Sequence, residues 1–107
     1  MDKRDNFRHD VKIQSRYRTG KGFARDVVVT DLSRHGCRMF DKFSSLSEGG
    51  YISIRIGSVG PIQARIRWRE HSVVGLEFDD PIHPSVLEHM CFTIEGWTES
   101  GPNDSPA

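Results

Sequence analysis

Polar and apolar residues alternate through most of the segment between residues 10 and 78. A period of two is typical of strands that bury one face and expose the other. Residues 23–32, FARDVVVTDL, are also rich in β-branched residues, which favour strands. The pattern predicts strands near residues 11–17, 23–32, 37–40, 52–56, 62–68 and 74–78.

Short polar or glycine-containing segments separate these strands. Residues 33–36 end the second strand, and the polar stretch 41–50 is typical of a loop. Residues 57–61 contain two glycines and a proline, so we expect the whole segment to be a hairpin connection.

The run from Ile62 to Trp68 has one apolar face, which predicts that Trp68 is a core residue. Its other face carries arginines. Glu77, on the polar face of the last strand, is positioned to pair with one of them across the strands. The arginines concerned are Arg65, Arg67 and Arg69.

The period changes to that of a helix after Pro84. Apolar residues at helical spacing continue from Val86 to Ile94, which predicts one amphipathic helix with Pro84 in its first turn. Six or so short strands and one closing helix indicate a mainly β fold. We expect a small six-stranded antiparallel β-barrel whose C-terminal α-helix covers one open end or edge.

Charge is distributed unevenly although the net charge is zero. Residues 1–25 hold eight basic and three acidic side chains, and the remainder is correspondingly acidic. An anion-binding function near the N-terminus would produce this asymmetry, and so would a solvated basic tail. The expected organisation is a flexible basic arm over 1–9, a barrel with its helix over 10–98, and a disordered tail over 99–107.

Several functional classes are disfavoured by the sequence. No apolar run is long enough for a membrane helix, and the charged N-terminus is unlike a secretory signal, so we expect a cytoplasmic protein. No nucleophile–base pair or phosphate-binding glycine loop is visible, which argues against an enzyme. Cys37 and Cys91 lack the spacing of common zinc sites and a disulfide is not expected, so we predict no metal and no cofactor.

The strand end at Asp31, Ser33 and Gly36 is the first candidate site. A carboxylate accepts two parallel hydrogen bonds, which matches the N1–H and N2–H donors of guanine, and Ser33 adds a hydroxyl on the same side. Gly36 permits a positive φ for the chain reversal and close approach of a ligand. The alternative is an Asx or Ser turn in which these side chains bond local N–H groups.

Arg4 and Arg8, spaced four apart in the basic arm, are the second candidate site. A guanidinium bonds phosphate bidentately, reads guanine O6 and N7, or stacks on a base. The alternative for this pair is a solvated basic tail.

Taken together, the two clusters resemble the PilZ domain family. The order Arg-x-x-x-Arg, strand, then Asp-x-Ser-x-x-Gly is complete here, and Gly75-Leu76-Glu77-Phe78 looks like a later strand of that family. The resemblance runs from about Lys3 to Trp97. It implies a six-stranded barrel that binds cyclic di-GMP, often as a stacked pair.

The resemblance also implies a role for each signature residue. Arg4 and Arg8 should contact phosphates and guanines, Asp31 and Ser33 should bond guanine, and Gly36 should shape the turn. Lys3 stands where many members have another arginine. Lysine keeps the charge but lacks the planar guanidinium fork, so the resemblance leaves open whether one or two nucleotides bind.

The function implied is a receptor and adaptor that changes its N-terminal arm on binding cyclic di-GMP and signals to a partner protein. Two alternatives remain: a PilZ-like interaction module without nucleotide binding, and a small nucleic-acid-binding barrel. Nucleic acid is disfavoured because the net charge is zero and only one aromatic residue, Phe7, lies near the arm.

Overall fold

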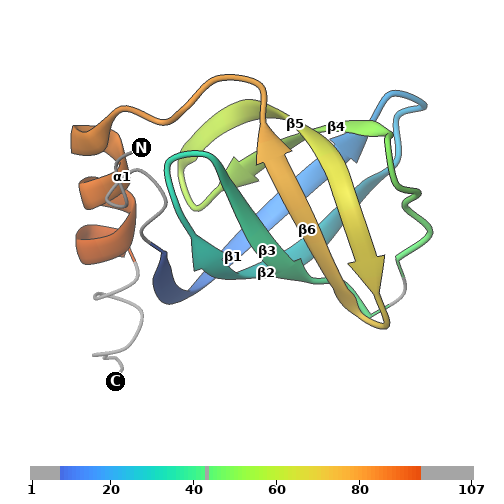
Figure 1. The fold of residues 1–107 in the computed structure, drawn as a ribbon, viewed down its shortest axis with the longest axis horizontal. Helices are drawn as coiled ribbons and strands as arrows, with labels where there is room; N and C mark the ends of the chain where they lie inside the picture. Colours follow the sequence, from blue (N-terminus) through green and yellow to red (C-terminus); the bar gives the residue numbers. More distant parts are fainter. Residues whose placement is uncertain (1–7, 43, 95–107) are drawn as a thin grey trace.

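Six strands close into a barrel in the computed structural model of the chain, which describes residues 8–42 and 44–94 (Figure 1). Their bounds are β1 (His9–Thr19), β2 (Ala24–Leu32), β3 (Gly36–Phe40), β4 (Tyr51–Ile56), β5 (Val59–Glu70) and β6 (Val73–Phe78). They pair antiparallel in the closed order β1-β2-β3-β6-β5-β4. The six-stranded antiparallel barrel predicted from the alternation is confirmed.

Alternation places one row of side chains from every strand inside the barrel, because successive residues of a strand point to opposite faces. In β1 the buried positions recur at every second residue from Val11 to Tyr17. Each of the six strands contributes at least one fully buried side chain to the core, among them Ile13, Val29, Met39, Ile54, Ala64 and Val74.

The connection between β4 and β5 is shorter than the predicted hairpin segment. Val59 already pairs with Ile56, so only Gly57 and Ser58 form the turn. Gly57 has a φ of 60°, which suits a glycine in so tight a reversal. Pro61 therefore belongs to β5, next to a shift of strand register where its missing N–H is tolerated.

The prediction that Trp68 is a core residue is wrong, since its side chain is 39% exposed. Ile66 pairs with Leu76, but Trp68 pairs with the adjacent Gly75, so β5 contains a bulge at this point. A bulge adds one residue to one strand and breaks the alternation of faces. The bulge directs Trp68 to the outside of the barrel, where its ring lies against Gly75.

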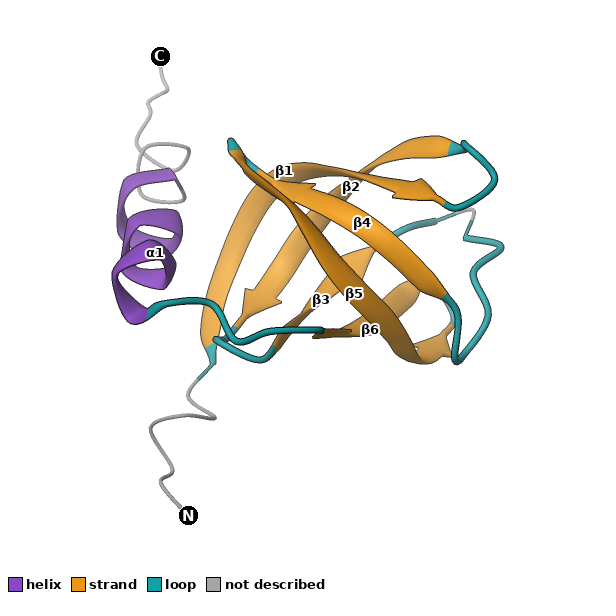
Figure 2. Ribbon diagram, turned by 90° about the horizontal axis from the view of Figure 1, so that it is seen from above, coloured by secondary structure: helices purple, strands orange, loops and turns teal. Residues whose placement is uncertain are grey.

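The C-terminal helix lies at one end of the barrel, as predicted (Figures 1 and 2). It consists of an α-helix, α1 (Pro84–His89), and a π-helical segment, η2 (Met90–Ile94), rather than one regular helix. Pro84 is in the first turn, and His83 Nδ1 caps that turn by accepting from the Ser85 N–H at 3.0 Å. None of the helices in the described part of the chain is long and apolar enough to cross a membrane.

The C-terminal helix buries a narrower stripe than the sequence predicts. Met90 and Cys91 are adjacent in sequence and both are buried, together with Leu87 of α1. Val86, which the helical period placed on the same apolar stripe, is exposed. The predicted stripe is therefore confirmed at Leu87, Met90 and Cys91 and wrong at Val86.

A buried carboxylate ties strands together at the end of the barrel away from the helix. Asp41 follows β3 directly and accepts hydrogen bonds from the Tyr17 hydroxyl at 2.7 Å and from Arg25 Nε at 3.3 Å. Its N–H donates to the Ser72 carbonyl at 2.8 Å. Asp41 thereby links β1, β2 and the β5–β6 turn.

Candidate ligand-binding site

The turn between β2 and β3 is closed by Ser33. The Ser33 N–H and hydroxyl both donate to the Gly36 carbonyl, at 2.9 and 3.2 Å, and the His35 N–H donates to Ser33 Oγ at 3.3 Å. Ser33 thus forms the local turn that was the alternative to a ligand contact. The turn is further held by the Phe78 and Ile82 N–H groups, which donate to its carbonyls at 2.8 Å each.

Gly36 serves a purpose different from the one predicted. Among the described residues, the glycines with positive φ are Gly22, Gly49, Gly57 and Gly60, so Gly36 does not supply the reversal by a left-handed conformation. A Cβ at Gly36 would lie 2.1 Å from the Leu76 carbonyl oxygen. Glycine is needed here because β3 and β6 approach too closely for any side chain.

Asp31, two residues before the turn, bonds arginines rather than local N–H groups. Its Oδ1 accepts from Arg8 Nη1 at 2.9 Å, across 23 positions of sequence. Its Oδ2 accepts from Arg38 Nε at 3.2 Å and from a second N–H of the same guanidinium. Asp31 is buried, whereas the Arg8 and Arg38 side chains are 52% and 45% exposed.

Arg38 was missed in the sequence as a site residue. It lies directly opposite Asp31 in the β2–β3 pairing, next to the pair formed by Leu32 and Cys37. Counting outward from the four-residue turn would have placed Arg38 across from Asp31. A basic residue opposite a candidate carboxylate was therefore a usable signal.

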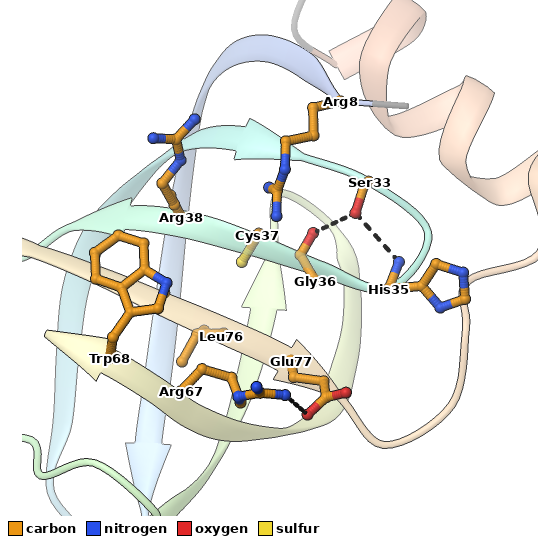
Figure 3. Close-up of a pocket in the computed structure, with 11 residues that line it drawn as sticks. Arg8, Ser33, His35, Gly36, Cys37, Arg38, Arg67, Trp68, Leu76 and Glu77 are labelled. Carbon is orange, nitrogen blue, oxygen red and sulfur yellow. Dashed lines mark hydrogen bonds and ion pairs between the residues drawn. The ribbon is translucent and has the colours of Figure 1, made fainter. Parts of the chain in front are cut away.

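A pocket of about 430 Å³ opens beside this turn. In Figure 3, Arg8 and Arg38 lie on one side of it, and Trp68 and the Arg67–Glu77 pair lie on the other. Asp31 does not line the pocket itself, but both arginines bonded to it do. The lining comprises Arg8, Ser33, His35, Gly36, Cys37, Arg38, Arg67, Trp68, Gly75, Leu76 and Glu77.

Comparison with known proteins identifies the family to which this fold belongs. The family model of the PilZ domain matches residues 2–93, which is most of the chain. The chain belongs to the PilZ domain family. Among solved structures, a PilZ domain of CeSA from a cellulose-synthesizing bacterium is similar at 19% identity and a TM-score of 0.58, over 87% of this chain and 98% of that one. A comparison with curated proteins finds no match.

PilZ domains are generally binding modules. The structure describes four of the signature residues of this one and leaves two outside the described residues. Arg8 and Ser33 line the pocket with Gly36, and Asp31 joins them through its bond to Arg8. Lys3 and Arg4 lie outside the described residues.

Trp68 and Arg67 form the wall of the PilZ pocket that sequence reasoning did not assign to a site. Trp68 was placed in the core because the bulge in β5 has no clear signature in the sequence. Arg67 donates to Glu77 Oε1 at 2.7 Å, and Arg65 donates to the same oxygen at 3.2 Å. The predicted cross-strand pairing of Glu77 is confirmed, with two arginines instead of one.

Glu77 keeps this wall close to electrically balanced. Hydrogen bonds from Arg67 and then Arg65 lower the pKa of Glu77, so it stays ionised at neutral pH. Among the residues that line the pocket, the charges of Arg67 and Glu77 cancel, so the net positive charge of the lining comes from Arg8 and Arg38, whose shared partner Asp31 does not line it.

Cys37 lies at the floor of the pocket but is poorly suited to chemistry. Burial, and secondarily the charge of Asp31, raises the pKa of the Cys37 thiol to about 12. A thiol rather than a thiolate faces the pocket at neutral pH, and only the thiolate is a good nucleophile or metal ligand. No group of three His, Cys, Asp or Glu side chains within residues 8–42 and 44–94 is arranged to hold a metal ion.

Proposed function

We propose that this PilZ domain is a cyclic di-GMP receptor that acts as an adaptor and catalyses no reaction. The observation that carries the proposal is the meeting of Arg8 and Asp31 beside an open pocket. These residues come from the two separate signature motifs, 23 positions apart. An ion pair that served only to stabilise the fold would not need to have its arginine in the lining of a pocket.

The groups around the pocket match the chemistry of a guanine nucleotide. The Asp31 carboxylate is suited to accept from guanine N1–H and N2–H, and a guanidinium is suited to phosphate or to guanine O6 and N7. The exposed indole of Trp68 offers a flat surface for base stacking. Arg4 and Lys3 would add charge from the arm, and the measured stoichiometry decides between one nucleotide and a stacked pair.

Ligand entry requires an exchange of partners at Asp31, because its carboxylate offers about four acceptor positions and already accepts three hydrogen bonds, whereas a guanine edge needs two more. Arg8 is the partner that leaves more easily, since it makes one bond and precedes β1, whereas Arg38 makes two and lies within β3. The released Arg8 guanidinium is then available to a phosphate.

Movement of Arg8 provides a route to a partner protein. The next residue, His9, lies edge-on to the ring of Phe92 in η2, with 5.8 Å between centroids. We expect displacement of Arg8 to disturb this contact and change the surface around the C-terminal helix. Such a coupled change of arm and helix would constitute the signal.

Isothermal titration with cyclic di-GMP, run beside GTP and cyclic GMP, tests the proposal. We expect saturable binding of cyclic di-GMP alone, weakened about 100-fold in Asp31→Ala and in Arg8→Ala, because each loses charge-assisted bonds to the ligand. Arg69→Gln, which removes an exposed arginine of β5 outside the pocket, is the matched control and should bind normally. Tight binding that survives both site substitutions would contradict the site.

A fluorescence experiment reports on the pocket wall directly. The chain has two tryptophans, so Trp97→Phe leaves Trp68 as the only one. We expect cyclic di-GMP to change the Trp68 emission in this variant with the same midpoint as the titration. Absence of any binding would favour an interaction module that does not use a nucleotide.

A further inference from the structure

A second pocket lined by arginines lies mainly on β1 and β4. These two strands are across the barrel from β3 and β6 (Figure 2). The pocket has a volume of about 320 Å³, and it shares no lining residue with the first pocket. The lining residues are Arg16, Tyr17, Arg18, Ala24, Ser53, Arg55 and Pro61. The proposed cyclic di-GMP site makes no use of this pocket.

The strand pairing here brings like charges together. Arg16 of β1 lies directly opposite Arg55 of β4, and Arg18 is the diagonal neighbour of Arg55. Like charges facing each other across two strands destabilise a sheet. The barrel gains no stability from this arrangement, so the cluster of arginines points to a role other than holding the fold together.

Within residues 8–42 and 44–94, carboxylates compensate one of the three arginines. Arg16 bonds Asp26 at 2.6 Å, but both side chains are well exposed to solvent. Arg18 and Arg55 bond only backbone carbonyls in this described part of the chain, those of Gly22 at 3.5 Å and Gly60 at 3.4 Å. These distances are long for N–H···O bonds, which are usually shorter than 3.2 Å.

The first pocket provides a contrast. There each arginine has a carboxylate: Arg8 and Arg38 bond Asp31, and Arg67 bonds Glu77. The guanidinium groups of Arg18 and Arg55 therefore retain donors that the described residues do not use. Ser53, directly opposite Arg18, adds a hydroxyl to the same wall.

We propose that this pocket binds the phosphoryl group of a small molecule, independently of the site at Asp31. Planar guanidinium forks match the oxygens of a phosphate, and a dianion would relieve the repulsion between Arg16 and Arg55. The pocket is larger than a single phosphate, which leaves space for a second phosphoryl group or for part of the body that carries it.

Titration of the full chain with inorganic pyrophosphate, followed by NMR, tests this proposal. We expect saturable shifts of the Arg18 and Arg55 Nε–H signals and of the neighbouring amides in β1 and β4. Arg18→Gln and Arg55→Gln should each weaken binding about tenfold, which corresponds to the loss of one charge-assisted contact. Arg69→Gln removes the same charge elsewhere on the barrel and should leave the affinity unchanged.

Two further arms distinguish a specific phosphate site from general charge attraction and from a membrane contact. The Arg18 and Arg55 signals should titrate with the same midpoint in Asp31→Ala as in the wild type, because the two pockets share no residue. Equal weakening in Arg69→Gln would indicate general charge attraction and overturn the proposal. Binding to vesicles of anionic phospholipid without binding to free pyrophosphate would also overturn it, in favour of a membrane contact.

Discussion

Two buried aspartates stand at opposite ends of the β2–β3 hairpin, Asp31 near its turn and Asp41 at its open end. Both are almost inaccessible to solvent, and each accepts hydrogen bonds from two side chains. In each case at least one partner is an arginine. Judged by carboxylate burial and bonding alone, the two would be equivalent.

Their partners differ in position and exposure. Asp41 is bonded by Tyr17, whose side chain is fully buried although it belongs to the lining of the second pocket, and by Arg25 of β2, which is 38% exposed. Asp31 is bonded by two half-exposed arginines, both of which line a pocket. The comparison teaches that two exposed, charged partners at one pocket, rather than burial of the carboxylate, distinguish the candidate ligand site from a carboxylate that holds a buried tyrosine in place.

The largest expected effect comes from removing each carboxylate in turn. Asp41→Ala leaves the Tyr17 hydroxyl buried without its acceptor and should lower the free energy of unfolding by about 4 kcal/mol. Asp31→Ala should cost only about 1 kcal/mol, because its arginines can return to solvent.

Urea unfolding and cyclic di-GMP titration of both variants measure this difference. Asp41→Ala, studied at a temperature where it is folded, should retain its affinity for the ligand, while Asp31→Ala should lose it. Equal losses of stability in the two variants would remove the distinction drawn between them.

Two glycines of the Asp31 end give the next largest effect. A Cβ at Gly36 would meet a backbone oxygen of β6, so Gly36→Ala should destabilise the barrel by about 3 kcal/mol. A Cβ at Gly75 would lie 2.3 Å from the Trp68 ring, a half-exposed side chain that can move aside. Gly75→Ala should therefore alter Trp68 fluorescence and ligand affinity more than thermal stability. A larger stability loss in Gly75→Ala than in Gly36→Ala would contradict this assignment.

At the Asp41 end, Tyr17→Phe removes one hydrogen bond and should cost about 1 kcal/mol near neutral pH. Burial, and then the bond to Asp41, raises the pKa of Tyr17 above its ordinary value of 10.0. A group whose pKa is raised by folding stabilises the protein below its unfolded pKa, and this contribution is lost as the pH rises.

Stability should consequently fall more steeply above pH 10 in the wild type than in Tyr17→Phe. Urea titrations at pH 8 and pH 11 measure the difference, and the raised pKa of Cys37 contributes equally to both proteins. Parallel pH dependence in the two proteins would show that Tyr17 ionises as readily in the folded state as in the unfolded state.

The smallest effect is expected at Glu77, which is exposed. Its pKa is lowered mainly by the hydrogen bond from Arg67, so its contribution to stability is present above its ordinary pKa and is lost as the pH falls. Carbon-detected NMR should place its titration midpoint below the ordinary value of 4.5, moving upward in Arg67→Gln. An unchanged midpoint in that variant would exclude Arg67 as the main cause.

The strands could be predicted well because each of them buries only one face. The alternation in β1 from Val11 to Tyr17 follows directly from the pleat of a strand and needs no knowledge of its neighbours. The same reasoning failed at Trp68, because a bulge is defined by the pairing of two strands. It failed at Val86 because a helical period does not fix the width of the buried stripe, and α1 buries only Leu87.

The candidate site was predicted in part. Arg8, Asp31 and Ser33 could be selected because their residue types and order carry the family pattern, and family membership is now established. Arg38 and Trp68 could not be selected by motif, since they reach the pocket only through strand register and the bulge. The reason for Gly36 also lay outside the sequence, in the approach of β6 to β3.

The sequence by itself determined the barrel class, the closing helix and the residues that carry the family signature. These properties depend on short-range periodicity and on residue types, which can be recognised in the sequence without knowledge of the fold. Only the tertiary structure decided that both partners of Asp31 are exposed arginines at one pocket, and which arginines of the described chain bond carboxylates. Those properties depend on the register between strands distant in the chain, and a shift of one residue reverses every side chain.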